Sequence, residues 1–355
     1  MAALEQLPDK DKDEILPLFP LKGWAAANKL ESTIKRVSQS IGTRRWIADI
    51  DVSFLTDNKI FLFTGAHPDR EVFQQLKDLL NPQNGYANWC RFIEQNENVI
   101  PCLRHESLEN VSAQIERLSA LNRGIVVKLS SADGSVERQD FILKSLKGAN
   151  VESVLLIYDL ETIDRNYHEQ ITHLLGYFFK AKDLIPEIAL SISSTSFPSG
   201  FAKQLRGHSS IYERLLFNEL IEIPGLESLI YSDRGSARAQ KQDGGSGTPP
   251  PRIDYPLKKD WQFVRREFDE NVPDSKLRRK QAYIDIANEI IKEQYWVPEL
   301  RLWGTQQIEI TAEGDEFGIY SAMKSTAVRI NIHLFNQLHY NTKDEDINTD
   351  EEWID

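Results

Sequence analysis

Short apolar runs rich in β-branched residues alternate with amphipathic helical patterns along most of this 355-residue chain. Each run is long enough to be a buried strand, and the segments between the runs carry apolar residues at helical spacing or are loops. This order is typical of parallel strands joined by crossover helices. The predicted strands cover residues 15–22, 46–51, 99–105, 125–129, 154–159, 188–193, 228–233 and 261–265, and the predicted helices cover residues 25–41, 69–80, 86–95, 108–121, 167–180, 210–220 and 276–295.

Eight predicted parallel strands indicate an α/β fold of the TIM type, a (β/α)8 barrel. A doubly wound open sheet is the alternative, but such sheets usually have about five to seven strands and a glycine-rich first turn. We expect a single barrel over residues 1–300, a C-terminal extension over 301–340 and an acidic, disordered tail over 341–355. Strand-like runs at 306–311 and 328–334 predict that the extension contains a β-hairpin packed on the barrel.

The charge balance and the absence of known motifs exclude several classes of function. The chain has 54 acidic and 42 basic residues, so no overall positive field attracts nucleic acid or an anionic membrane. No apolar run of about 18 residues occurs and the N-terminus is acidic, which predicts a cytoplasmic protein without a signal peptide. Cys90 and Cys102 are expected to be reduced. No closed zinc site can be identified, and Walker, dinucleotide-binding and GxSxG motifs are absent.

The predicted strands end in polar and ionisable residues. The carboxyl ends of barrel strands line one mouth, where barrel enzymes have their active sites. Lys128 is the strongest candidate, because desolvation lowers the pKa of a lysine and makes its amine reactive. The alternative is a structural ion pair with an aspartate. The candidates for catalysis are Asp49, Asp51, His105, Lys128 and Asp159, and those for ligand binding are Lys22, Arg104, Asp233 and Arg234, with Arg252 from the following loop.

Asp49 and Asp51 lie two residues apart on one predicted strand. Their carboxylates should therefore point to the same face, which suits a shared proton or a hard cation such as Mg²⁺. Two carboxylates do not define a metal site, and salt bridges to nearby lysine and arginine side chains are the alternative. His105 is the best general acid or base by its intrinsic pKa, with a capping or exposed histidine as the alternative.

A long loop at 234–256 separates the seventh and eighth predicted strands. Its glycine, serine and proline content does not favour a regular element, so we expect a mobile loop. The loop carries Arg234, Arg238, Lys241 and Arg252, which could close over an anionic ligand and exclude water. A solvated insertion without a functional role is the alternative.

Several segments, taken in order, resemble one family. They are residues 15–34 (ILPLFPLKGWAAANKLESTI), 46–51 (WIADID), 98–105 (NVIPCLRH), 229–237 (LIYSDRGSA), 251–256 (PRIDYP) and 329–334 (RINIHL), together with the strand around Trp261. Through them the chain resembles the beta protein family of phages, prophages and bacterial genomic islands. The resemblance implies a TIM-type barrel and an intracellular role in phage–host conflict beside a nuclease or other effector. The polar positions matched by the resemblance, which add Tyr231 to the candidate ligand-binding residues, are Lys22, Asp49, Tyr231, Asp233 and Arg252, with Ser232 where glycine is common.

Two classes of function stay open. The sequence favours a component of a phage-defence or phage–host conflict system that recognises a phage-derived partner, an effector partner or an anionic ligand at the strand ends, because it contains no catalytic signature. The alternative is a barrel enzyme of hydrolase or phosphodiesterase type that acts on a phosphorylated or nucleotide small molecule, with Mg²⁺ as the metal such a site would suit. The net charge of −12 disfavours DNA binding.

Overall fold

The computed structural model describes residues 1–130, 136–198, 200, 204–239, 248–343 and 349. Part of the loop predicted at 234–256 lies outside the described residues, namely 240–247 with Lys241. Most of the tail predicted to be disordered also lies outside them, namely 344–348 and 350–355.

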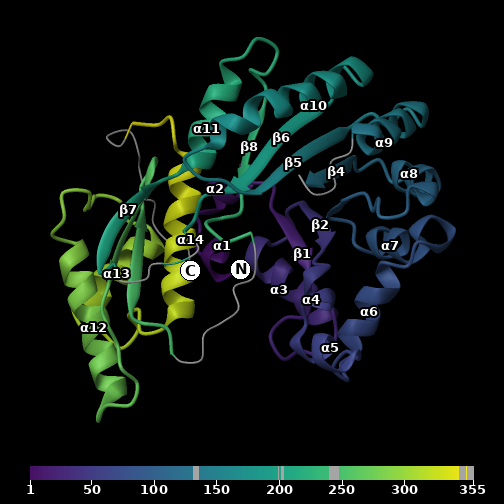
Figure 1. Ribbon diagram of the computed structural model, residues 1–355. Helices are drawn as coiled ribbons and strands as arrows, with labels where there is room; N and C mark the ends of the chain where they lie inside the picture. Colours follow the sequence, from purple (N-terminus) through teal and green to yellow (C-terminus); the bar gives the residue numbers. More distant parts are fainter. Residues whose placement is uncertain (131–135, 199, 201–203, 240–247, 344–348, 350–355) are drawn as a thin grey trace.

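The predicted α/β architecture is confirmed, since parallel strands alternate with helices (Figure 1). The parallel strands are β1 (Leu18–Leu21), β2 (Trp46–Ile50), β3 (Val99–Pro101), β4 (Ile125–Ser130), β5 (Val154–Thr162), β6 (Ala189–Thr195) and β8 (Ile230–Asp233). They form one sheet in the order β1-β2-β3 and another in the order β4-β5-β6-β8. A bridge between Cys102 and Val126 joins the two sheets, and the Leu103 amide donates to the Val126 carbonyl at 2.8 Å. The strand order therefore follows the chain order, so the carboxyl ends of neighbouring strands meet at one edge.

The predicted eighth barrel strand lies in a different sheet. β10 (Asp260–Arg265) pairs antiparallel with β7 (Arg206–Ser210) and with β9 (Arg252–Pro256). A short turn links β9 to β10, in which the Leu257 amide donates to the Asp260 carbonyl at 2.8 Å, and strands joined so closely pair antiparallel. The prediction of a parallel eighth strand is therefore wrong, and so is that of a loop without regular structure up to residue 256. Among the described strands no pairing joins β8 to β1, so a closed eight-stranded barrel is not shown.

The hairpin predicted in the C-terminal extension is also wrong, because both runs form helices. They are α13 (Trp303–Ala312) and α14 (Ala322–Leu338). In α14 the buried apolar residues Val328, Ile332 and Phe335 are spaced by four and three, which is helical spacing. The two helices pack closely: a Cβ added to Gly304 would lie 2.7 Å from the Ile332 side chain.

Helices cover the outer side of the parallel strands, as α7 to α10 show in Figure 1. None of the described helices combines the length and the apolar character needed to cross a membrane. The remaining helices are α1 (Ala2–Glu5), α2 (Asp9–Asp13), α3 (Glu31–Ile41), α4 (Ser53–Thr56), α5 (Lys59–Thr64), α6 (Glu71–Leu79), α7 (Gln83–Gln95), α8 (Val111–Ser119), α9 (Val136–Gly148), α10 (Ile171–Leu184), α11 (Tyr212–Ile221) and α12 (Ser275–Ile290), with short 3-10 turns at Leu108–Asn110 and Tyr167–Gln170.

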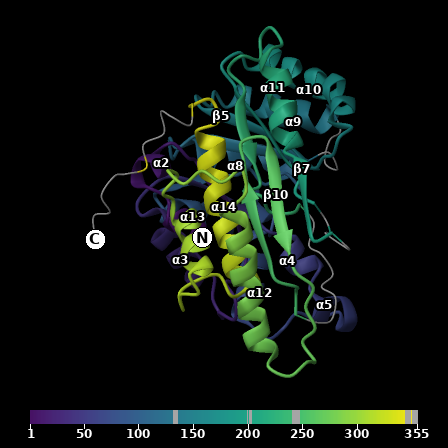
Figure 2. The same cartoon turned by 90° about the vertical axis from the view of Figure 1, so that its left-hand side faces the viewer.

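Two apolar cores meet at α14. The larger core lies between the parallel strands and their helices and includes Phe335 of α14. The smaller core joins the antiparallel sheet to α12, α13 and α14 through residues such as Ile253, Ile286, Ile308 and Ile332, and Figure 2 shows these helices beside that sheet. Because α14 contributes to both cores, it connects the antiparallel sheet to the carboxyl ends of the parallel strands.

Candidate functional site

Three of the predicted residues meet at the carboxyl ends of the parallel strands and form what we call the Asp49 cluster: Asp49, Arg104 and Lys128. Asp49 is 3% exposed; its Oδ1 accepts from Arg104 Nη1 at 2.5 Å and its Oδ2 accepts from Lys128 Nζ. Burial alone would raise the pKa of Asp49, but the charges of Lys128 and Arg104 hold it below its ordinary value. Asp49 is therefore an ionised carboxylate shared by two cations.

The pKa of Lys128 shifts in the direction opposite to the prediction. Burial lowers the pKa of its amine, as expected, but the Asp49 carboxylate outweighs burial and raises that pKa above its ordinary value. The amine thus stays protonated near neutral pH. This geometry agrees with the structural ion pair and not with a reactive, uncharged lysine.

Lys22 and Asp51 form a separate pair at the rim. Their charged atoms are 2.9 Å apart, and Ser53 donates its hydroxyl to Asp51 Oδ1 at 2.5 Å. Asp49 and Asp51 therefore have different partners, although they were predicted to act on one face. The described residues contain no group of three or more His, Cys, Asp or Glu side chains placed to hold a metal ion.

His105 is buried and its ring is engaged by the backbone. Its Nε2 lies 2.9 Å from the Lys128 carbonyl, and Arg138 donates to the His105 carbonyl at 2.6 Å. The exposed histidine that the sequence left as an alternative is not what the structure shows. The ring lies beside the Asp49 cluster and bonds to the main chain of one of its members.

Asp159, in the second half of β5, pairs with Arg234, which follows β8. Arg234 Nη2 lies 2.5 Å from Asp159 Oδ2, and the Glu161 amide donates to Asp159 Oδ1 at 3.0 Å. Asp159 is 5% exposed. Arg234 was predicted to bind an anionic ligand, and the anion that it contacts here belongs to the protein itself.

The end of β8 carries a second buried carboxylate with several donors. Asp233 Oδ2 accepts from the Tyr231 hydroxyl at 2.8 Å and from His333 Nε2 at 2.7 Å, while Oδ1 accepts from the Gly235 amide at 2.6 Å. Burial would raise the pKa of Asp233, but His333 and the other donors lower it to about 2. His333 comes from α14 and is fully buried, so this group joins the two parts of the fold.

Two buried residues of α11 lie beside this carboxylate. Glu213 accepts from the Ser196 amide at 2.9 Å, and burial, with a further contribution from Asp233, raises the pKa of Glu213 to about 7. The Arg214 guanidinium lies 3.4 Å from the centre of the Tyr231 ring. Neither residue is among the candidates that the sequence predicts, because both lie in a predicted helix and the candidates come from strand ends.

Arg252 opens β9 and belongs to a group of cationic side chains around Phe197, away from the Asp49 cluster. Its Nε lies 2.9 Å from Asp254 Oδ1, while Arg329 Nη1 of α14 lies 2.9 Å from Asp254 Oδ2. Arg329, Arg238 and Arg252 lie 3.9, 5.6 and 5.8 Å from the centre of the Phe197 ring. Three arginines from three segments thus face one buried aromatic ring.

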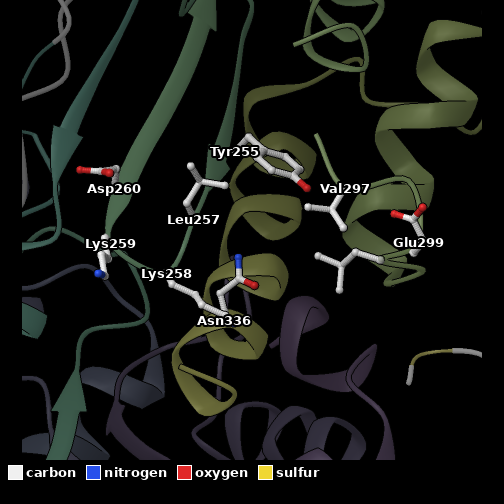
Figure 3. Close-up of a pocket in the computed structure, with 9 residues that line it drawn as sticks. Tyr255, Leu257, Lys258, Lys259, Asp260, Val297, Glu299 and Asn336 are labelled. Carbon is white, nitrogen blue, oxygen red and sulfur yellow. The ribbon is translucent and has the colours of Figure 1, made fainter. Parts of the chain in front are cut away.

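A hollow of about 320 Å³ lies between the β9–β10 turn, α14 and the segment that precedes α13. Figure 3 shows Lys258 and Asn336 on one side of it, with Val297 and Glu299 across from them. None of the residues predicted for catalysis or ligand binding lines this hollow. Its lining consists of Tyr255, Leu257, Lys258, Lys259, Asp260, Val297, Glu299, Leu300 and Asn336.

The signal for the missed α14 residues was present in the sequence. Arg329 and His333 are four residues apart, as are Val328 and Ile332, so a helical interpretation of this segment places both polar side chains on one face. A strand would also place Arg329 and His333 on one face, so this spacing alone does not distinguish a helix from a strand.

The sequence model of the family described as Beta protein matches residues 1–339. Protein beta of Enterobacteria phage P4 is 27% identical over 346 residues, which cover 95% of this chain and 89% of the phage protein. No solved structure matches the chain significantly.

Proposed function

The chain belongs to the Beta protein family, as its sequence predicts, and on this premise we propose that it acts in phage–host interaction by binding a partner protein through α5. The proposal is supported by one observation above the others, the exposed apolar surface of α5. We call Ile60, Leu62 and Phe63 the α5 surface; these side chains are 52%, 69% and 92% exposed. Neighbouring apolar side chains left in water mark interaction sites.

The α5 surface is held in a defined conformation. The Asn58 side chain accepts from the amides of Ile60 and Phe61 at 3.1 and 3.2 Å and begins the helix. Gly65, with φ of 72°, ends it in the left-handed conformation that favours glycine. Phe61 stacks on His67 with ring centres 4.2 Å apart, which anchors the inner side. A short helix fixed at both ends presents its apolar side chains without a large loss of entropy on binding.

The position of α5 suits recognition at the strand ends. It lies in the connection between β2, which carries Asp49, and α6, and it follows α4 in that connection (Figure 1). Val52, in the same connection, is a further exposed apolar residue. A partner bound to α5 would therefore lie on the connection that begins at the end of the Asp49 strand.

The internal ion pairs favour binding over catalysis. Asp49 is ionised and shared by two cations, and Asp159 pairs with Arg234. A general base needs a free lone pair, and a nucleophilic lysine must be uncharged. The protonated Lys128 provides neither, so the enzyme alternative has less support than partner binding.

A plating experiment tests the proposal. Cells that express the wild-type chain are challenged with a panel of phages, and we expect fewer plaques for at least one phage. The variant Leu62→Ser with Phe63→Ser removes two exposed side chains; if each contributes about 1.5 kcal/mol or more when buried by a partner, the affinity falls at least about a hundredfold and protection is lost.

The matched control is Phe317→Ser with Met323→Ser, which changes two apolar residues that are 69% and 84% exposed elsewhere on the molecule. This control should keep wild-type protection at an equal protein level. Protection by the α5 variant equal to that of the control would refute the proposal, and so would a wild-type chain without effect on any phage in the panel.

A further inference from the structure

A buried group of ionisable side chains connects α11 to β8 and α14, apart from the α5 surface and the Asp49 cluster. We call Glu213, Arg214, Asp233 and His333 the α11 junction. We propose that the α11 junction is a pH-sensitive switch: Glu213 is a neutral acid while the C-terminal half of α14 is docked, and loss of its proton to solvent releases that half of the helix. The inference does not rest on the proposed protein partner.

The first support is the incomplete hydrogen bonding of Glu213. Its side chain is buried; Oε2 accepts from the Ser196 amide at 2.9 Å, whereas Oε1 has no hydrogen-bond partner among the residues that the structure describes. The Asp233 carboxylate, by contrast, accepts three hydrogen bonds through its two oxygens. Burying an ionised carboxylate is costly unless donors surround it, while a neutral carboxylic acid needs fewer of them. The surroundings of Glu213 therefore suit the neutral form.

The second support is the ionised carboxylate beside Glu213. Asp233 is in register with Ser194 on the neighbouring strand β6, two residues before Ser196, which donates to Glu213. Both carboxyl groups thus lie at the same end of the β6–β8 pair. A proton lost from Glu213 would leave two negative charges together in a buried place.

The other ionisable groups around Glu213 bond to other partners. These groups come from three elements and are Asp233 and Tyr231 of β8, Arg214 of α11 and His333 of α14. His333 Nε2 lies 2.7 Å from Asp233 Oδ2. Arg214 donates from Nε and Nη2 to the side chain and the carbonyl of Gln337 at 2.8 and 3.0 Å. Both side chains are therefore engaged elsewhere and do not neutralise an ionised Glu213.

The third support is the attachment of α14. The contacts of His333 and Gln337 lie about one helical turn apart and hold the C-terminal half of α14 to β8 and α11. The N-terminal half is held separately, because Arg329 bonds to Asp254 of β9 at 2.9 Å. A repulsion that arises at the α11 junction would therefore act on residues 333–338 more than on the rest of the helix.

The direction of the switch follows from the two carboxyl groups. Burial raises the pKa of Glu213 to about 7, against about 4.3 for an exposed glutamate, whereas Asp233, with its pKa lowered to about 2, stays ionised. The docked state is thus complete at low pH and is lost as the pH rises through about 7. With these pKa values, the equilibrium constant for release rises about tenfold between pH 6 and pH 8.

Hydrogen exchange of the full chain, followed by mass spectrometry, tests the proposal. Exchange rates at pH 6 and pH 8 are divided by the intrinsic rates of an unfolded chain at each pH, and residues 333–338 are compared with α8, which packs in the larger core. In the wild type we expect the protection of residues 333–338 to fall about tenfold from pH 6 to pH 8. At pH 8 it should be lower than that of α8 and change little in dilute urea, as local opening does.

Glu213→Gln removes the titration, while the amide oxygen of glutamine can still accept from the Ser196 amide. In this variant residues 333–338 should therefore be equally protected at both pH values. The matched control is Glu222→Gln, which removes an exposed carboxylate directly after α11 and should keep the change of about tenfold.

Three results would each overturn the proposal: a wild type whose residues 333–338 are equally protected at pH 6 and pH 8, protection equal to that of α8 at pH 8, or a Glu213→Gln variant that keeps the wild-type change. If Glu213→Gln does not fold, the first two results still decide, because they need only the wild type. The α5 surface is unchanged throughout, so failure here leaves the partner proposal standing.

Discussion

Replacing Asp49 by asparagine separates a structural role of the Asp49 cluster from a chemical one. Asparagine keeps the shape of the side chain but removes the charge that Arg104 and Lys128 share. The Arg104 side chain is 7% exposed and cannot return to water, whereas Lys128 is 31% exposed and can partly rehydrate. Leaving a buried charge without its partner costs about 3–5 kcal/mol. Because Lys128 is partly exposed and Arg104 keeps its ion pair with Glu106, we expect the free energy of unfolding to fall by the lower value, about 3 kcal/mol.

Lys128→Met is the matched control. It removes the more exposed cation and leaves the ion pair between Asp49 and Arg104 in place, so we expect a smaller loss, about 1 kcal/mol. Both losses are measured by urea unfolding at pH 7, followed by circular dichroism. The pKa of Asp49 is lowered in the folded chain, so its stabilisation is complete above the pKa of an unfolded aspartate, about 3.9, and is lost only as the pH falls further. Measurements at pH 5 and pH 7 should therefore give nearly the same difference between Asp49→Asn and the wild type.

The refuting result is an Asp49→Asn variant as stable as the wild type, or one that loses less stability than Lys128→Met. Either outcome would mean that the two cations do not depend on this carboxylate for compensation. If such a stable variant also lost protection against phage, Asp49 would have to act on a ligand, and the enzyme alternative would gain support.

Three further predictions concern other buried groups. Burial raises the pKa of Glu213 to about 7, above the value of about 4.3 in an unfolded chain, so ionising this carboxyl costs more stability as the pH rises through that range. In urea unfolding, Glu213→Gln should therefore be more stable than the wild type by about 3 kcal/mol at pH 8 and by only about 1 kcal/mol at pH 5. The pKa of Asp233 is lowered to about 2, against about 3.9 in an unfolded chain, so Asp233→Asn should lower the free energy of unfolding at pH 7 by about 2.6 kcal/mol in urea unfolding. Burial raises the pKa of Cys90 to about 11 and that of Cys102 to about 12, so neither thiol should react with a disulfide reagent at pH 8 until urea unfolds the chain.

The positions of the parallel strands could be predicted because a buried strand needs only a short apolar run, whereas β7 and β9 were not predicted. The pairing of β10 was missed, although the sequence contained the relevant signal. Only residues 257–259 separate β9 from β10, whereas a parallel crossover needs about a dozen residues or more. The spacer length therefore predicts a hairpin. The hairpin was not predicted because the glycine- and proline-rich loop before β9 was expected to continue to residue 256, which includes β9.

The helices of the extension were mistaken because two periods coincide in their sequence. Val328, Ile330 and Ile332 alternate like the residues of a strand, but Val328 and Ile332 are also one helical turn apart. The structure buries Val328 and Ile332 completely and leaves Ile330 partly exposed. Packing against Gly304 of α13 decides between the two periods, and this contact is tertiary, so no local pattern contains it.

The same helix explains why the polar sites could be predicted only in part. Charges that end neighbouring parallel strands must meet, so Asp49 could be expected to find Arg104 and Lys128. The partners of Asp233 and Asp254 come instead from α14: His333 is 100 residues from Asp233 in sequence, and Arg329 is 75 residues from Asp254. His333 and Arg329 are one helical turn apart on that helix and both are buried. A single helix, α14, therefore supplies the partners of both buried carboxylates, Asp233 at the end of β8 and Asp254 in β9.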